Sequence, residues 1–381
     1  MRYDYALVGG GLQSALIVLA LRERQPGARI ALVERAGTLG GNHTWSFHAD
    51  DVTDETRRRL EPLVVGQWAE HEVRFPGLRR TLAHGYASIS STRLNEVVRS
   101  RLEAAPGSAL FAGHSAALVE AHSVRLEDGR TLEATAVVDS RGMAVSPAPG
   151  GAGFQKFVGL EIVLEHPAAL ERPLIMDATV EQTDGFRFVY VLPLAPDRLL
   201  VEDTYFSESA HLDGETLRAR VHTYARERGW EPFVVAREES GVLPLPWRGS
   251  LPRPSPPLRA GYAGGFFHPV TGYSLPVAAR LAELVASLPP ERLFGPELAA
   301  FARRHARQAR FGRILNWLMF RAYPPAKRWH ILERFYREMP EATIRRFYAL
   351  DTTRGDRARL LLGRPPRGFS LRHVLAGHQT A

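Results

Sequence analysis

Hydrophobic positions in the first part of the chain follow the order strand, helix, strand. Residues 4–8 form an apolar run that ends in glycines, which is typical of a parallel strand buried on both faces. Residues 12–24 carry apolar side chains at helical spacing and are followed by Pro26 and Gly27. Residues 29–34 form a second apolar run. The pattern therefore predicts a β–α–β unit at the N-terminus.

Periodicity and turn signals predict the remaining elements. Helices are expected near residues 52–60, from Ser91 or Thr92 as N-cap to about Leu102, over 214–228, over 276–288, and through most of the chain beyond Pro296. Strands are expected in a hairpin over 123–132, over 134–139, over 186–192, over 198–201, and at 261–265, where a strand runs into glycines.

The order of these elements predicts an α/β protein. We expect a Rossmann-type domain built from residues 1–150 and 250–290, because both ranges contain strands that run into glycines. A β-rich substrate domain, residues 151–249, is expected to be inserted between them, and residues 291–381 are expected to form a basic helical segment at the C-terminus.

The composition excludes some kinds of catalytic and metal site and bears on where the protein is found. The 381 residues include no cysteine, which excludes disulfides, thiol catalysis and cysteine-ligated metal sites. The net charge is +8, but residues 301–381 alone hold 18 arginine and lysine residues against five acidic ones. The chain starts almost directly on a strand without a secretory signal, and no window offers an uninterrupted apolar span, so we expect a cytoplasmic protein that does not cross a membrane.

The strongest local motif is Gly9-x-Gly11, placed between a buried strand and a helix. Glycines there allow a tight turn and let the backbone approach a pyrophosphate at the helix N-terminus. Glu34 ends the second strand, where a carboxylate can accept hydrogen bonds from a ribose. This arrangement predicts a dinucleotide, and glycines at 40–41 and 264, together with Asp139-x-x-Gly142, favour FAD over NAD.

Longer motifs then strongly resemble the bacterial lycopene β-cyclases. They occur in consistent order from residue 4 to about 365, and GGNHTWSF and FHPVTGYSLP are far more specific than GxG. They are VGGGL (8–12), GGNHTWSF (40–47), IMDATV (175–180), GFRFVY (185–190), LVEDT (200–204), FHPVTGYSLP (267–276), RFY (334–336) and RFY (346–348).

The resemblance implies an enzyme that uses reduced FAD to convert linear lycopene, through a monocyclic intermediate, into β-carotene without net redox change. It also implies NADPH as the electron donor to the flavin, and lycopene and related linear carotenoids as substrates. The residues we expect to bind the cofactor are Gly9, Gly10, Gly11, Leu12, Glu34, Arg35, Gly41, Asp139, Gly142, Gly272 and Tyr273.

Cyclisation of a polyene requires a strong acid close to the terminal double bond. Glu202 follows an apolar strand, and burial there would hold its carboxyl protonated. From the residues alone, a salt-bridged carboxylate at a strand end is an equal alternative, and the resemblance favours the catalytic role. Asp203 would face the opposite side of the strand and is expected to form structural hydrogen bonds. His268 is also a catalytic candidate, although His-Pro before a helix more often has a positional role.

Two further features bear on function. Residues 271–274 precede a helix whose N–H groups could stabilise negative charge on a flavin ring, and an ordinary helix cap is the alternative. No set of histidine and acidic residues has the spacing of metal ligands, so we expect no metal.

Apolar residues recur at helical spacing in the basic C-terminal segment, alongside five arginines. The apolar residues are Phe311, Ile314, Leu315 and Leu318, and the arginines are 303, 304, 307, 310 and 313. Such a helix suits peripheral attachment to the anionic surface of the inner membrane, and a solvated capping helix is the alternative. Nucleic-acid binding is not expected, because no recognised module accompanies the charge.

Two other functions remain open at this point. An FAD monooxygenase of the aromatic-hydroxylase type would share the N-terminal unit and the Asp139-x-x-Gly142 region. A carotenoid carrier that binds flavin but has no catalytic activity is the other alternative. Consumption of O₂ and NADPH separates a monooxygenase from a cyclase, and the requirement for a proton donor separates an enzyme from a carrier.

Overall fold

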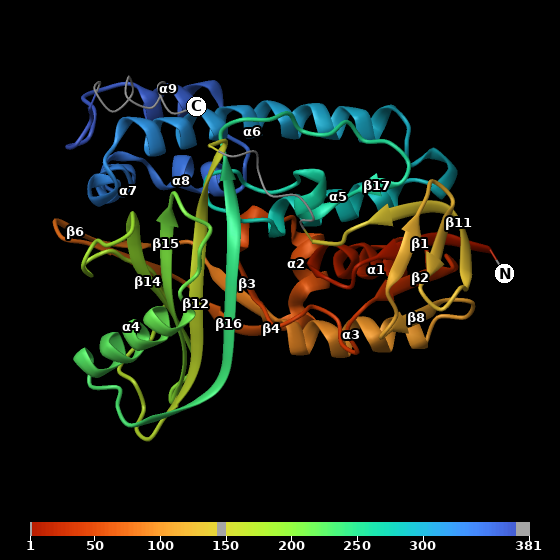
Figure 1. Ribbon diagram of the computed structural model, residues 1–381, viewed down its shortest axis with the longest axis horizontal. Coiled ribbons are helices and arrows are strands. Elements are labelled where there is room, and N and C mark those ends of the chain that lie inside the picture. Colours follow the sequence, from red (N-terminus) through yellow and green to blue (C-terminus); the bar gives the residue numbers. More distant parts are fainter. Residues whose placement is uncertain (1, 143–149, 371–381) are drawn as a thin grey trace.

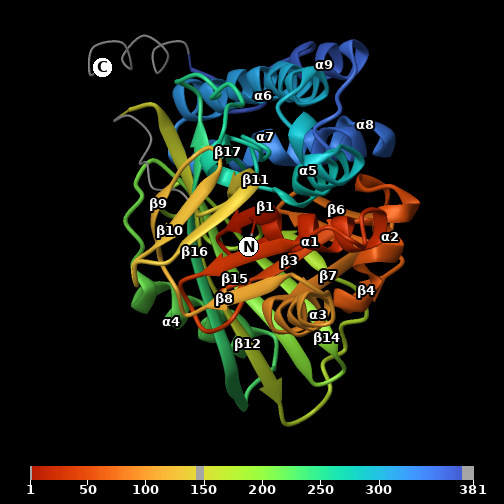
Figure 2. The ribbon, with the colours of Figure 1, turned by 90° about the vertical axis from the view of Figure 1, so that its right-hand side faces the viewer.

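The computed structural model describes residues 2–142 and 150–370. Two large β-sheets lie side by side, with a smaller sheet and a group of helices between and above them (Figures 1 and 2). Residues 143–149 and 371–381 belong to the ranges expected for the first domain and the C-terminal segment, and they lie outside the described residues.

The first sheet contains the β–α–β unit that the sequence predicts. Strand β1 (Arg2–Val8), helix α1 (Leu12–Arg24) and strand β2 (Ile30–Glu34) follow one another, and β1 pairs in parallel with β2 and with β11 (Thr131–Asp139). The strand order is β8-β2-β1-β11-β10-β9, with β17 (Leu258–Arg259) also paired to β11. The other strands are β8 (Ala109–Ala112), β9 (Ala116–Val119) and β10 (Ser123–Leu126).

Helices pack on this sheet through buried aliphatic side chains. Helix α1 packs against α5 (Leu275–Ser287) and α3 (Ser91–Glu103) within one apolar cluster. The N-cap of α3 is Ser90, one residue before the expected Ser91. The strand expected at 261–265 is wrong: β17 ends at Arg259 and Gly261–Gly264 form a short 3₁₀ helix, because Gly261 and Gly265 both have a positive φ.

The second sheet has the order β16-β12-β15-β14-β13-β5-β6. Strands β16, β12, β15 and β14 pair antiparallel. The strands are β12 (Ala152–Leu164), β13 (Leu174–Asp177), β14 (Phe186–Ala195), β15 (Arg198–Ser207), β16 (Phe233–Pro246), β5 (His71–Phe75) and β6 (Leu78–Leu82). Strands β5 and β6 therefore join this sheet from an earlier part of the chain.

The two faces of the second sheet have different neighbours. Helix α4 (Gly214–Glu227) covers one face, where Val201 and Tyr205 of β15 pack with its apolar side chains. Leu200 and Phe206, on the opposite face of β15, join an apolar cluster that reaches the C-terminal helices. Alternation along β15 thus assigns successive side chains to two separate cores.

A three-stranded sheet with the order β3-β7-β4 lies between the large sheets. Its strands are β3 (Thr44–His48), β7 (Tyr86–Ser90) and β4 (Val64–Trp68), and helix α2 (Asp54–Leu60) follows β3. Thr53 caps α2 by accepting a hydrogen bond from the Thr56 N–H. The hydroxyl groups of Tyr190 on β14 and Ser46 on β3 form a hydrogen bond, which connects this sheet to the second large sheet.

Helices form the C-terminal part of the described chain, as predicted. They are α6 (Pro296–Ala322), α7 (Trp329–Glu338), α8 (Glu341–Tyr348) and α9 (Arg354–Leu361), and they lie together above both large sheets (Figures 1 and 2). Within residues 2–142 and 150–370, no helix is both long enough and apolar enough to cross a membrane.

Candidate functional site

Three consecutive glycines connect β1 to α1, and each has a different reason to lack a side chain. Gly9 has φ +93°, and a Cβ there would come within 2.9 Å of the backbone of Ser140 and Arg141. A Cβ at Gly10 would meet the Leu39 side chain at 2.5 Å. Gly11 has open space around it and caps α1 without a side-chain hydrogen bond. Gly9 and Gly10 therefore permit the turn, whereas Gly11 leaves room at a helix N-terminus.

Glu34 lies beside this turn. Its carboxylate accepts hydrogen bonds from the N–H groups of Gly10 (2.6 Å) and Ala36 (2.8 Å). Leu12 is the first residue of α1, and Arg35 next to Glu34 is exposed. The glycine turn, the uncapped helix N-terminus and the strand-end carboxylate are thus in contact, as the sequence predicts for a dinucleotide site.

Two further segments with expected cofactor contacts lie next to the glycine turn. The Gly40 N–H donates to the Gly10 carbonyl at 2.9 Å, so the segment containing Gly41 adjoins the glycine turn. The Ser140 N–H donates to the Val8 carbonyl at 2.7 Å, which brings the segment after Asp139 to the same end of β1. Asp139 pairs with Arg141 at 2.8 Å, and Gly142 is exposed at the edge of the described residues.

A second glycine turn precedes α5. Gly272 has φ +65°, and a Cβ there would approach the Leu243 side chain at 3.0 Å, so β16 comes close to this turn. Tyr273 donates a hydrogen bond to Asp51 at 2.8 Å. Ser274 caps α5 without a side-chain hydrogen bond, and the first turn of the helix contains no acidic residue. This helix N-terminus therefore keeps its positive end available to a negatively charged group.

These features fit an extended dinucleotide. Gln13 of α1 donates to the Ala278 carbonyl of α5 at 3.1 Å, so the helices that start at the two glycine turns contact each other. The two open helix N-termini suit two negatively charged parts of one ligand. Sequence reasoning found both glycine turns; their proximity depends on the packing of α1 against α5.

Glu202 lies in the middle of β15, not at a strand end as the sequence suggested, because β15 continues to Ser207. Its Oε1 accepts a hydrogen bond from Thr204 Oγ1 at 2.6 Å. The residue is partly buried, and protein surrounds its carboxyl group. Burial, assisted by the charge of Glu239, raises the pKa of Glu202 to about 8. The carboxyl is therefore protonated at neutral pH.

Four neighbouring strands place Tyr190, Glu202, Gly159 and Glu239 in one row. Tyr190 of β14 pairs with Glu202, Glu202 pairs with Gly159 of β12, and Gly159 pairs with Glu239 of β16. A Cβ on Gly159 would lie 3.4 Å from the Glu202 Cβ and 3.2 Å from the Glu239 Cγ. The missing side chain of Gly159 therefore leaves the two glutamates adjacent. Glu239 was not a candidate, because nothing in its local sequence indicates this pairing.

Glu239 is anchored on the side of the small sheet. Its Oε2 accepts hydrogen bonds from Thr44 Oγ1 (3.0 Å) and Arg237 (2.6 Å). Burial raises the pKa of Glu239, and Arg237 opposes that rise. An ion-paired Glu239 therefore supplies the negative charge that raises the pKa of Glu202 further.

A chain of hydroxyl groups leads from this row into the small sheet. The hydroxyl of Tyr190 lies 2.7 Å from Ser46 Oγ and 3.1 Å from the Tyr86 hydroxyl, and Ser46 lies 2.7 Å from Ser88 Oγ. These four side chains come from β3, β7 and β14. They form a hydrogen-bonded polar group that links β14, next to Glu202, to the small sheet.

Asp203 and His268 have structural partners. Asp203 is fully buried on the α4 side of the sheet, where it accepts hydrogen bonds from Arg187 and Tyr205, both at 2.7 Å. His268 Nε2 lies 2.9 Å from the Phe347 carbonyl, and its Nδ1 accepts from the Val270 N–H at 3.2 Å. With both ring nitrogens engaged by the backbone, His268 is positioned as a link between the second glycine turn and α8.

An apolar pocket of about 200 Å³ lies among the C-terminal helices. Leu315 and Leu318 of α6 line it, together with Phe335, Phe347 and the exposed Phe369. Its lining side chains Val270, Met319, Leu332, Phe335, Met339 and Phe347 belong to the same apolar cluster as Leu200, Phe188 and Phe206. Continuous apolar packing therefore extends from this pocket to the sheet face that carries Glu202.

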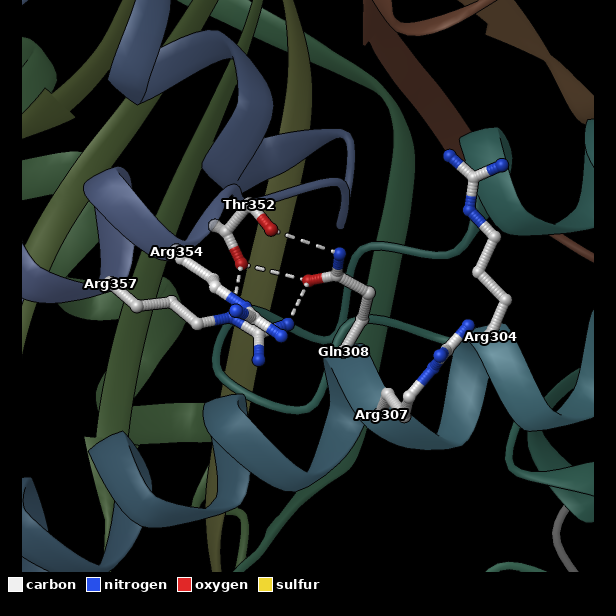
Figure 3. A pocket seen from close by; sticks show the side chains of 6 residues that line it. All are labelled: Arg304, Arg307, Gln308, Thr352, Arg354 and Arg357. Atoms are coloured by element: carbon white, nitrogen blue, oxygen red, sulfur yellow. Dashed lines mark hydrogen bonds between the residues drawn. The ribbon is translucent and has the colours of Figure 1, made fainter.

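A second pocket, of about 520 Å³, contains four arginines from α6 and α9: Arg304, Arg307, Arg354 and Arg357 (Figure 3). Gln308 and Thr352 hold Arg357 by hydrogen bonds of 2.9 and 3.1 Å, and Arg304 pairs with Asp351. Within the described ranges, Arg307 and Arg354 have no acidic partner. The pocket is therefore suited to an anionic group.

Solved structures share the fold. A geranylgeranyl bacteriochlorophyll reductase-like protein from Thermoplasma acidophilum superposes with a TM-score of 0.64 at 11% identity, covering 100% of this chain and 96% of the other. p-Nitrophenol 4-monooxygenase from Pseudomonas putida gives a TM-score of 0.66 at 15% identity, covering 93% and 99%. These similarities confirm the predicted α/β architecture with a Rossmann-type FAD-binding fold.

Sequence comparison is more specific. The chain is 44% identical to a lycopene beta-cyclase of Pantoea ananas over 96% of this chain and 95% of the relative. It is 43% identical to a lycopene beta-cyclase of Paracoccus sp. over 96% and 95%. The family described as lycopene cyclase protein matches residues 4–373. The chain belongs to the lycopene cyclase family.

Proposed function

We propose that this protein cyclises lycopene to β-carotene through a monocyclic intermediate. The observation that carries the proposal is Glu202, a buried carboxyl with a pKa of about 8 on the sheet face that is continuous with an apolar pocket. A hydrocarbon offers no group that a charged site could recognise, whereas its terminal double bond can accept a proton. The names of the relatives from Pantoea and Paracoccus agree with this reaction.

The acid step uses Glu202 as the proton donor. Transfer of its proton to the terminal double bond forms a carbon–hydrogen bond and a carbocation. Attack by an internal double bond then closes the ring, and the ring cation gives one proton to a base. One proton is added and one removed, so no electrons are gained or lost. Thr204 holds one carboxyl oxygen at 2.6 Å, which orients the donor. Burial, assisted by the nearby charge of Glu239, keeps the proton on Glu202 at neutral pH.

The cofactor in this proposal is FAD in its reduced form, with NADPH as the electron donor. When bound, reduced FAD supplies negative charge that stabilises a nearby carbocation. Gly9–Gly11 and α1 would hold its pyrophosphate, and Glu34 its ribose. Gly272, Tyr273 and the N-terminus of α5 would face its ring system. Arg35, Gly41, Asp139 and Gly142 remain predicted cofactor contacts.

The apolar pocket is the proposed entrance for the polyene. Phe188 and Tyr190 of β14 are the proposed lining residues next to Glu202, because both belong to or pack on the cluster shared with the pocket. The pocket volume of about 200 Å³ accommodates one end of a long hydrocarbon. Leu361 and Phe369 line the pocket and are exposed, so its mouth presents apolar surface to the surroundings.

Peripheral membrane attachment follows from the same surface. The arginine pocket and the apolar pocket both lie between α6 and α9. Arg307 and Leu318 are eleven residues apart on α6, which corresponds to about 16 Å along a helix. Cationic groups beside an apolar opening match an anionic lipid surface that holds the hydrocarbon substrate.

We also propose the domain division predicted from the sequence: residues 1–150 and 250–290 for the cofactor, 151–249 for the substrate and 291–381 for membrane contact. Strands β5 and β6 depart from this division. They belong to residues 1–150 in sequence, but they complete the sheet of the substrate domain.

The test is anaerobic incubation of purified protein with reduced FAD and lycopene in lipid vesicles, followed by chromatography of the pigments. We expect β-carotene, with the monocyclic product at early times and no stoichiometric oxidation of NADPH. Unchanged lycopene despite bound FAD would favour a carrier. Product formed only with O₂ and with NADPH consumed in proportion would instead identify a monooxygenase, which the fold similarity to p-nitrophenol 4-monooxygenase makes the relevant competitor.

A further inference from the structure

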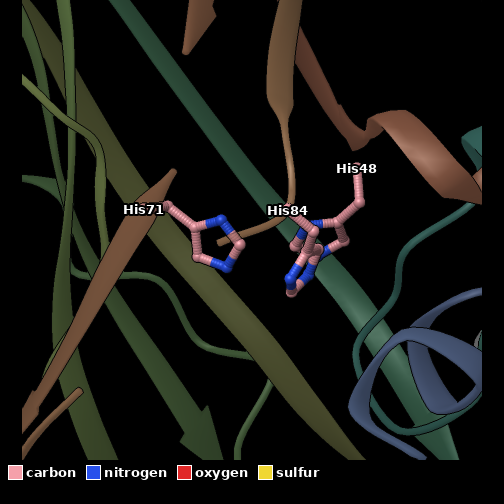
Figure 4. Close-up of side chains that lie close together, drawn as sticks. All are labelled: His48, His71 and His84. Atoms are coloured by element: carbon pink, nitrogen blue, oxygen red, sulfur yellow. The ribbon is translucent and has the colours of Figure 1, made fainter. Parts of the chain in front are cut away.

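The spacing of histidines along the chain predicts no metal site, but the fold brings three of them together. His48 ends β3, His71 begins β5 and His84 lies in the loop between β6 and β7 (Figure 4). The ring centroids are 4.9 Å apart for His48 and His71, 4.7 Å for His48 and His84, and 4.7 Å for His71 and His84. One ring nitrogen from each lies within 4.8 Å of the other two.

All three imidazoles are buried and lack hydrogen-bond partners for most of their nitrogens. Their side chains are exposed by 3%, 0% and 5%, in the order His48, His71 and His84. Both nitrogens of His71, both of His84 and Nδ1 of His48 have no partner. Buried polar atoms are nearly always paired, so five nitrogens without a protein partner leave donor atoms available to a ligand that all three rings share.

The rings are in the form that binds a metal. Burial lowers the pKa of each of the three imidazoles, with neighbouring histidines adding to the effect at His48 and His71. No carboxylate hydrogen-bonds to them, and the aromatic rings of Tyr86 and Tyr348 lie 4.9 and 5.3 Å from His48. Neutral imidazoles with free lone pairs are ligands for divalent transition metals.

We propose that His48, His71 and His84 bind one divalent transition-metal ion, with Zn²⁺ as the native ion. Three imidazoles and no carboxylate oxygen exclude Ca²⁺ and Mg²⁺, which require oxygen ligands. Zn²⁺ accepts three histidines and a water molecule in a tetrahedral site. Zn–N distances of about 2.0–2.1 Å place ligand atoms roughly 3.4 Å apart, so the rings close in by about 1 Å on binding.

The position of the site indicates a structural role. His48 belongs to the small sheet and His71 to β5 of the second large sheet, so one ion would join the two. Tyr86 pairs with His48 across β3 and β7, and its hydroxyl contacts Tyr190 next to Glu202. The metal would thus fix this hydrogen-bonded polar group without taking part in proton transfer, and the inference does not depend on the cyclase proposal.

The test uses untagged, full-length protein treated with a chelator and then dialysed against Zn²⁺ or Co²⁺. We expect one metal ion per chain by elemental analysis. We also expect the visible ligand-field bands of tetrahedral Co²⁺ and a higher melting temperature with Zn²⁺ than in the metal-free protein. Less than about one-tenth of an ion per chain, without Co²⁺ bands in folded protein, would overturn the proposal and leave buried water as the partner of these nitrogens.

Variants assign the ion to this site. H71Q and H84Q each keep a polar side chain of similar size, and we expect each to lower Zn²⁺ affinity at least about 100-fold. H166Q changes an exposed histidine and serves as the matched control. If H71Q does not fold, H84Q decides the question because its residue lies in a loop. Unchanged Co²⁺ bands in a folded H84Q variant would place the ion elsewhere and contradict the proposal.

Discussion

Glu202 and Glu239 face each other across Gly159, which has no side chain to separate them. The two carboxyl groups differ in their surroundings: Arg237 and Thr44 hydrogen-bond to Glu239, whereas Glu202 accepts a hydrogen bond from the Thr204 hydroxyl. A pair of carboxyl groups in unequal environments separates into one that stays ionised and one that keeps its proton. The geometry assigns the proton to Glu202.

Replacing Glu202 by Gln should abolish ring formation. Gln has the same shape and still accepts a hydrogen bond from Thr204, but it has no acidic proton. We expect the rate of β-carotene formation to fall at least about 100-fold, while FAD binding remains as in the wild type. Glu202→Asp should lose about 100-fold, because its carboxyl is withdrawn by roughly 1 Å. Anaerobic turnover with pigment chromatography measures both.

The control for this prediction is Glu238→Gln. Glu238 is the neighbour of Glu239 on β16, is partly exposed and pairs with Arg218, so its loss should leave turnover unchanged. Wild-type turnover in Glu202→Gln would assign the acid to another residue, with Asp203 next to be tested.

The pH dependence of turnover should follow the protonated form of Glu202. Its pKa is raised to about 8, so the acid is available below that pH, and the rate should fall about ten-fold per pH unit above it. Glu239→Gln removes a charge that raises this pKa and should therefore move the alkaline limb to lower pH. A pH–rate profile of both proteins measures the shift; identical limbs would show that Glu239 does not act on Glu202.

Gly11→Ala should weaken FAD binding without unfolding the protein. A methyl group there enters open space, with no strained φ, at the helix N-terminus where a pyrophosphate would bind. We expect an affinity loss of about ten-fold or more, equivalent to at least about 1.4 kcal/mol. Fluorescence titration of the metal-free and flavin-free protein measures it.

Two other glycine variants make this result specific. Gly27→Ala, also in open space but outside the turn, should bind FAD normally. Gly9→Ala should lower the melting temperature even without FAD, because its φ is +93° and its methyl group would meet the backbone at 2.9 Å. Equal FAD affinity in Gly11→Ala and Gly27→Ala would mean that the pyrophosphate does not approach this turn.

Removing two arginines from the basic pocket should weaken vesicle binding. Arg307 and Arg354 line the pocket, and each is worth about 1 kcal/mol near an anionic surface. The double variant Arg307→Gln and Arg354→Gln should therefore lower binding to anionic vesicles about 30-fold. Binding of the wild type should also decrease as salt increases.

The matched control removes two exposed arginines, Arg101 and Arg125, of which Arg101 lies on α3. Helix α3 lies at the opposite side of the molecule from α6 and α9 (Figures 1 and 2). If both double variants lose the same vesicle affinity, the loss is due to the lower net charge and not to the pocket. If the Arg307 and Arg354 double variant binds vesicles as the wild type does, the arginine pocket faces solvent and does not contact the membrane.

Local patterns were sufficient for the N-terminal β–α–β unit and for the cofactor turn. The alternation of apolar runs with glycines predicts β1, α1 and β2, because each depends on neighbouring residues alone. The prediction at Gly261–Gly264 is wrong for the same reason: glycine after an apolar run suits a strand end and a 3₁₀ turn equally. The length of β15 was underestimated because Glu202 and Asp203 interrupt its apolar run.

By itself, the sequence determined the N-terminal unit, its glycine turn and the motifs that place the chain in its family. Only the tertiary structure decided which side chains meet: strand register puts Glu239 opposite Gly159 and Glu202, and sheet packing gathers His48, His71 and His84. Hydrogen-bonded register and packing join residues that are distant along the chain, and no local pattern records that pairing.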